Sequence, residues 1–220
     1  IQRDFYLAHE LSHQWWGNDV FIDASRDWWL IEGMADYCAC TCLERTQGEA
    51  AGSWIWLWEV RDLLDYYDEG GVDHPLVPDS PVAMAPQVVY IKGAWVLRML
   101  EDVMGADGVQ ELLSDLRAEH SFAPIHTQRF IDLANSLAGE DLSWFFEQWL
   151  SGQGLVNLDE SHQVDGEQLS LKISQQSVWN GNPPSYFRMP LQILLEKGGA
   201  ERLHEVEVMQ SDEDFVLALP

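Results

Sequence analysis

Two histidines one helical turn apart constrain this chain more than any other feature of its sequence. His9-Glu10-Leu11-Ser12-His13 lies inside an apolar helical pattern, and residues four apart on a helix project from the same face. Both imidazole rings can therefore reach one metal ion. Glu10, directly after the first histidine, projects to the side of that face, where its carboxylate can act as a general base on a metal-bound water.

Glu32 is a candidate third ligand from the next predicted helix. Eighteen residues separate it from His13, and a catalytic zinc site has three protein ligands and one open position. Taken alone, Glu32 would be an ordinary solvated carboxylate, but the histidines favour the metal interpretation. Asp36, four residues further on, either orients a ligand histidine through its second ring nitrogen or is a plain polar helix position. The sequence thus predicts a zinc metallopeptidase site.

The periodicity of apolar residues predicts a mainly α region followed by a β region. Four prolines within residues 72–86 predict a long irregular loop between helices. After residue 151 the pattern alternates and predicts about four or five antiparallel strands, fewer than the roughly seven of a full sandwich. The expected helices span residues 3–16, 27–45, 49–67, 87–104, 107–120, 127–138 and 142–150.

The strong negative charge limits the partners of this chain. Its formal net charge is −25, from 37 acidic and 12 basic residues, so nucleic acids and anionic membrane surfaces are not expected partners. Solubility explains this charge better than attraction of cationic substrates does. No apolar run is long enough to span a membrane. We expect a soluble protein and slightly favour the cytoplasm, but an upstream signal could precede Ile1. The oligomeric state stays open.

Three segments of the chain carry a more specific pattern. The first segment runs from His9 to Asn18. The second is Trp29-Leu30-Ile31-Glu32-Gly33-Met34-Ala35, which is similar to a segment of a known enzyme family, Trp-Leu-Asn-Glu-Gly-Phe-Ala. The third is Tyr90-Ile91-Lys92-Gly93. Together they resemble the aminopeptidase N-like family of gluzincin metallopeptidases, over about residues 3–150. The departures from the family pattern, Ile for Asn and Met for Phe, do not fall on ligand positions.

The resemblance implies a zinc-dependent aminopeptidase that acts on peptides or small aminoacyl compounds. At matching positions, His9, His13 and Glu32 would bind one Zn²⁺. Glu10 would activate the water, and Tyr90 would hydrogen-bond the oxyanion. Without the resemblance, a core tyrosine would be the preferred interpretation of Tyr90.

The resemblance also implies the domain organisation. Residues 1–151 would form the helical half of a thermolysin-like zinc metallopeptidase catalytic domain, and residues 152–220 the start of an incomplete antiparallel β-sandwich domain. The family binds the free N-terminus of its substrate through an upstream Gly-x-Met-Glu-Asn segment. Only eight residues precede His9, so we expect this chain to hold half of the site and to be weakly active or inactive alone.

Two alternatives to an aminopeptidase stay open. One is a catalytically silent gluzincin used as a scaffold or binding module, although such relatives normally lose a ligand, the base or the tyrosine. The other is an endopeptidase or an epoxide hydrolase on the same framework, which the upstream segment would decide. The sequence does not indicate the residue preferred at the cleaved N-terminus.

Overall fold

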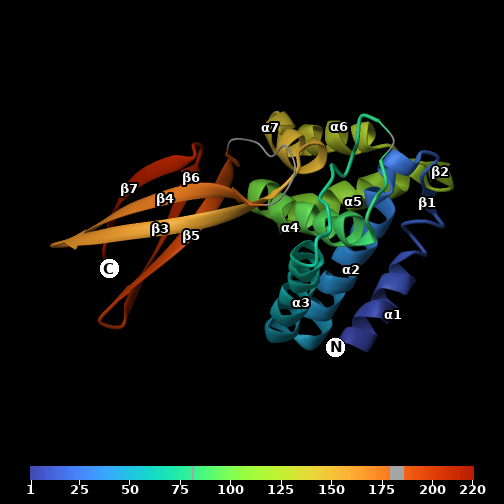
Figure 1. Cartoon of the computed structure of the whole chain (residues 1–220). Coiled ribbons are helices and arrows are strands. Elements are labelled where there is room, and N and C mark those ends of the chain that lie inside the picture. Colours follow the sequence, from blue (N-terminus) through green and yellow to red (C-terminus); the bar gives the residue numbers. More distant parts are fainter. Residues whose placement is uncertain (81, 179–185) are drawn as a thin grey trace. The chain divides into compact units, whose positions relative to one another are not determined.

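The chain forms two compact units, described here from a computed structural model that covers residues 1–80, 82–178 and 186–220. The first unit, Ile1–Gly152, is helical, and the second, Gln153–Pro220, consists of antiparallel strands (Figure 1). This α-then-β order confirms the predicted fold class. None of the helices in the described ranges is both long enough and apolar enough to cross a membrane.

The helical unit is organised around α2 (Trp29–Gln47), which lies between α1 (Gln2–Ser12) and α3 (Glu49–Asp68) (Figure 1). A further helix, α4 (Gly93–Met104), packs against α2 at very short range. A Cβ atom on Gly33 of α2 would lie 2.8 Å from the carbonyl carbon of Gly93, so only glycine allows this approach. The remaining helices are η1 (Ser25–Asp27), η2 (Val88–Lys92), α5 (Ala106–His120), α6 (Thr127–Ala138), α7 (Ser143–Phe146) and η3 (Glu147–Ser151).

The first helix is shorter than predicted. It ends at Ser12 rather than Trp16, and the next residues form tight turns. Trp16 makes a β-bridge next to β1 (Val20–Phe21), which pairs in parallel with β2 (Ala123–Pro124). This pairing joins segments about a hundred residues apart, and local periodicity cannot reveal it. The prediction of the helix end was therefore wrong because a tertiary contact competes with the helix.

The proline-rich loop leads into an unusual helical segment. Residues 71–80 and 82–85 form neither helix nor strand, as the prolines predict. Directly after them, η2 is a π-helix that continues into α4, whereas one regular helix was predicted over 87–104. Lys92 of η2 forms a buried ion pair of 3.2 Å with Asp73 of the loop. This contact ties the loop to the segment that carries Tyr90.

The second unit has two sheets with a shared apolar core. One sheet has the order β3 (Leu155–Asp165), β4 (Gln168–Val178) and β7 (Asp212–Ala218), and the other pairs β5 (Met189–Lys197) with β6 (Ala200–Val208). All neighbours are antiparallel, which agrees with the predicted four or five strands. The buried core residues come from both sheets and are Leu169, Leu171, Ile173, Val208 and Leu217.

Candidate metal and catalytic site

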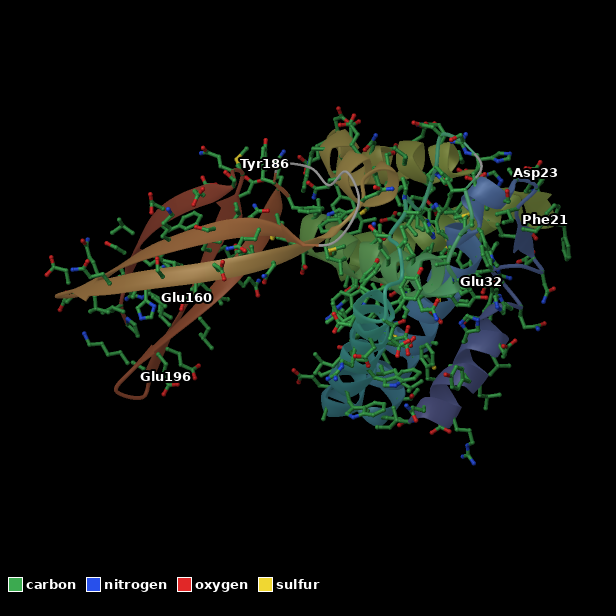
Figure 2. The ribbon with its side chains drawn as sticks, viewed as in Figure 1. Phe21, Asp23, Glu32, Glu160, Tyr186 and Glu196 are labelled. Carbon is green, nitrogen blue, oxygen red and sulfur yellow. The ribbon has the colours of Figure 1, made fainter. Side chains whose placement is uncertain are left out.

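The three candidate metal ligands, His9, His13 and Glu32, come together in the helical unit. Their ligand atoms all lie within 4.8 Å of one another. Glu32 extends from α2 toward α1 (Figure 2), and its Oε2 lies 3.6 Å from His9 Nε2 and 3.4 Å from His13 Nε2. Ligands about 2.1 Å from a tetrahedral zinc ion are about 3.4 Å apart. The spacing of the three side chains therefore suits a single ion.

Hydrogen bonds at the far side of both imidazole rings fix their orientation. His9 Nδ1 donates to Asp36 Oδ1 at 2.6 Å, and His13 Nδ1 donates to the carbonyl oxygen of Trp16 at 2.8 Å. Because a proton on Nδ1 satisfies each of these acceptors, each Nε2 can present a lone pair toward Glu32. Of the two roles considered for Asp36, the contact supports the orienting one.

Glu32 supplies an independent sign that a cation fits this position. Its Oε1 accepts a hydrogen bond of 3.1 Å from Trp28 Nε1, but its Oε2 is buried and has no hydrogen-bond partner among the described residues. A buried carboxylate oxygen without a partner is costly. A metal ion between Oε2 and the two Nε2 atoms would remove that cost, so the donor set fits the predicted ion.

The carboxylates around His9 favour a positive charge at this place. Burial opposes the imidazolium, but the hydrogen bond to Asp36 and the negative charges of Asp36 and Glu32 outweigh it and raise the pKa of His9 to about 10. For Glu32, burial acts to raise the pKa, but the nearby His9 ring, 3.6 Å from Oε2, and the hydrogen bond from Trp28 prevail and lower it. In the metal-free site, a proton on His9 thus offsets part of the negative charge.

Tyr90 lies against His9, one of the candidate ligands, rather than in the core. Its ring stacks on His9 with centroids 5.7 Å apart and planes 11° apart, and Trp28 contacts it edge-on at 5.9 Å. Burial, followed by the charge of Glu32, raises the pKa of Tyr90 above its usual value. The phenol therefore keeps its proton at neutral pH and can act as a hydrogen-bond donor.

A cavity of about 330 Å³ adjoins these side chains, which is within the range of small-molecule sites. Glu10, exposed on α1, lines it together with both histidines and Tyr90. Sequence reasoning missed the rest of the wall, including Tyr6, Trp58, Glu59 and Asp62. A signal for one of them existed, because Glu59 interrupts an apolar helical stripe. The residues that line the cavity are Phe5, Tyr6, His9, Glu10, His13, Asp36, Trp58, Glu59, Asp62, Pro86, Gln87, Tyr90 and Ile91.

Comparison with known proteins places the chain in a family. Residues 5–149, well over half of the sequence, match the Peptidase family M1 domain. The chain belongs to peptidase family M1. This family assignment agrees with the resemblance to aminopeptidase N-like enzymes that the three sequence segments carry.

Two M1 relatives are much longer than this chain. It is 25% identical to the Tricorn protease-interacting factor F2 of Thermoplasma volcanium over 92% of this chain and 26% of the relative. It is 26% identical to aminopeptidase N of Escherichia coli over 96% of this chain and 26% of the relative. The chain thus spans about a quarter of the length of these relatives.

Solved structures share the fold at low sequence identity. Aminopeptidase A of Legionella pneumophila, solved in complex with aspartic acid, superposes with a TM-score of 0.67 and 23% identity, covering 97% of this chain and 24% of that one. A two-domain M1 zinc metallopeptidase bound to L-tryptophan gives a TM-score of 0.60 and 22% identity, over 70% of this chain and 34% of that one. Both comparisons show the M1 fold.

Proposed function

We propose that the full-length protein is a zinc aminopeptidase, in which His9, His13 and Glu32 bind one Zn²⁺. Glu10 is the proposed general base and Tyr90 the proposed oxyanion donor. The observation that carries this proposal is the convergence of two Nε2 atoms on the unpartnered Oε2 of Glu32, with both Nδ1 atoms already hydrogen-bonded.

The proposed mechanism gives each side chain one task. When bound, zinc supplies a Lewis acid that polarises a carbonyl and lowers the pKa of water. Glu10 accepts a proton from the water that attacks the first peptide carbonyl, and later donates it to the leaving amine. Tyr90 donates a hydrogen bond to the oxyanion as the carbonyl carbon becomes tetrahedral. Asp36 keeps His9 in the tautomer that leaves Nε2 free for the metal.

Several observations favour an aminopeptidase over the alternatives. A silent scaffold is disfavoured because all five residues that the mechanism needs are present around one cavity or within reach of its ligand atoms. Relatives in this family carry the names aminopeptidase N, in Escherichia coli, and probable aminopeptidase 1, in Sulfurisphaera tokodaii. These names support hydrolysis of the N-terminal peptide bond rather than endopeptidase or epoxide hydrolase activity.

The test measures zinc content and aminoacyl arylamide turnover of the full-length protein and its variants. Glu10→Gln should keep one zinc per chain and lose about 10²–10⁴-fold in kcat, because the base is absent. Tyr90→Phe should also keep zinc and lose about 10²–10³-fold, because the oxyanion loses one donor. Glu49→Gln, on the exposed first turn of α3, is the matched control and should keep both properties.

Two results would contradict the proposal. Turnover by Glu10→Gln at the rate of the natural protein would exclude Glu10 as the base. Absence of zinc from the natural protein after loading, with full activity retained, would exclude the metal mechanism.

A further inference from the structure

Glu59 is a buried acid to which the mechanism gives no task. It lies on α3 with 4% of its surface exposed, between Ile55 and Leu63, which are exposed by 0% and 2%. Across the described ranges 1–80, 82–178 and 186–220, its carboxyl has neither a hydrogen bond nor an ion pair, yet it lines the cavity beside Glu10. An unpartnered carboxyl in an apolar stripe is costly. Its position on the cavity wall points to a ligand that pairs with it.

The surroundings of Glu59 specify the charge of that ligand. Asp62, one turn further along α3, lines the same cavity and is exposed. Aromatic rings complete this wall, since Trp58 contacts Tyr6 edge-on at 6.0 Å and Phe5 at 5.7 Å. Among the described residues, the cavity lining includes no lysine or arginine. Carboxylates beside aromatic rings suit a guanidinium or ammonium group.

The neighbouring carboxylate of Asp36 already has a hydrogen-bond partner. It accepts the hydrogen bond from His9 Nδ1 and is itself buried, so it is committed to the ligand histidine. Apart from the proposed base Glu10, the acids of the cavity lining that a ligand can reach are therefore Glu59 and Asp62.

The direction of the proposed reaction indicates which part of a peptide lies here. Glu10 donates its proton to the leaving amine, so the substrate residue that carries this amine lies beside Glu10. Tyr6 precedes Glu10 by one helical turn and lies on the same face of α1. The wall formed by Tyr6, Glu59 and Asp62 is thus next to the residue that follows the scissile bond.

We propose that the cavity binds the basic side chain of the second substrate residue, with Glu59 and Asp62 pairing with its guanidinium or ammonium group. This inference rests on the proposed aminopeptidase function and names a substrate class for it. The substrate α-amine, which belongs to the first residue, lies on the other side of the scissile carbonyl.

The electrostatics of Glu59 are consistent with this role. Burial, followed by the charges of Asp36 and Asp62, raises the pKa of Glu59 to about 9, so the carboxyl is neutral near pH 7 unless a cation lies beside it. A bound guanidinium would favour the ionised form and gain a charge-assisted hydrogen bond. Because glutamine resembles the neutral acid in shape and charge, Glu59→Gln should fold normally.

The test compares two dipeptide amides with the zinc-loaded, full-length protein. Leu-Arg-amide and Leu-citrulline-amide have the same first residue and nearly the same shape, but only the first carries a guanidinium. The natural protein should hydrolyse the arginine peptide with a kcat/KM at least about 10-fold higher. Glu59→Gln should bring this ratio within about 2-fold of one, and Asp62→Asn should lower it in part. Asp68→Asn, exposed on the same helix, is the control and should keep the ratio.

Two results would overturn the inference: a ratio near one in the natural protein, or an unchanged ratio in both Glu59→Gln and Asp62→Asn. Leucine arylamide, which has no second residue, tests the proposed function separately. If neither the arylamide nor the peptides are hydrolysed, the aminopeptidase proposal fails. Calorimetric affinities for the same two peptides, with the same variants and criteria, then decide the cation preference of the cavity.

Discussion

Metal binding at this site should be coupled to the release of a proton from His9. Burial opposes a charged ring, but the Asp36 hydrogen bond of 2.6 Å and the Glu32 carboxylate 3.6 Å from Nε2 raise the pKa of His9 to about 10. At pH 7.5 the metal-free ring therefore carries a proton on Nε2, which zinc must displace. This competition weakens zinc binding about 300-fold at pH 7.5, so the apparent Kd should fall about 100-fold between pH 6.5 and 8.5.

The assay is zinc titration of the metal-free, full-length protein against a competing chelator at several pH values. Calorimetry in buffers of different ionisation enthalpy should report about one proton released per zinc at pH 7.5. Asp36→Asn removes the main partner that holds the proton, so it should flatten the dependence of Kd on pH. An apparent Kd that is constant above pH 7.5 would refute the reasoning, because it would mean an ordinary imidazole pKa of about 6.5.

Three further predictions concern stability, each measured by urea unfolding followed by tryptophan fluorescence. In the metal-free protein, the raised pKa of His9 adds to the free energy of unfolding. This contribution is complete below about pH 6.5 and is lost as pH rises through about 10. A contribution to the free energy of unfolding that grows with pH would contradict this prediction. Gly33→Ala should cost about 1–3 kcal/mol, because the new Cβ meets the backbone of α4 at 2.8 Å. Gly108→Ala is the control, because its new Cβ meets only a flexible methionine side chain, and it should be neutral or stabilise the protein by up to about 1 kcal/mol. Equal losses of stability in both variants would show that the close packing of α2 against α4 does not require glycine at position 33. Asp73→Asn leaves the ammonium of Lys92 buried without its counter-ion and should cost about 3–5 kcal/mol; an unchanged urea midpoint would show that the ion pair does not stabilise the loop.

The sequence was most informative where a local pattern carries the chemistry. Helical spacing alone brings His9 and His13 to one face, and the predicted helix for Glu32 presents it toward them. Asp36 followed from the same periodicity, four residues after Glu32, and its contact with His9 is present. These side chains depend on only two neighbouring helices, so few tertiary contacts had to be foreseen.

Features set by distant contacts could not be predicted in this way. The carboxylate of Asp27 accepts hydrogen bonds from the backbone N–H and the hydroxyl of Thr127, a hundred residues away. The π-helix that carries Tyr90 differs from an α-helix by one residue per hydrogen-bonded turn, which residue periodicity does not resolve over five positions. The proposed role of Glu59 depends on the cavity that it lines, and this cavity is formed by tertiary packing.

The central claim is that His9, His13 and Glu32 hold one zinc ion. The most direct test is a crystal structure of the zinc-loaded, full-length protein with anomalous data collected on both sides of the zinc absorption edge. The account predicts one strong zinc peak within about 2.0–2.2 Å of both Nε2 atoms and of Glu32 Oε2. A loaded protein with no peak there, or with zinc bound only by other residues, would contradict it.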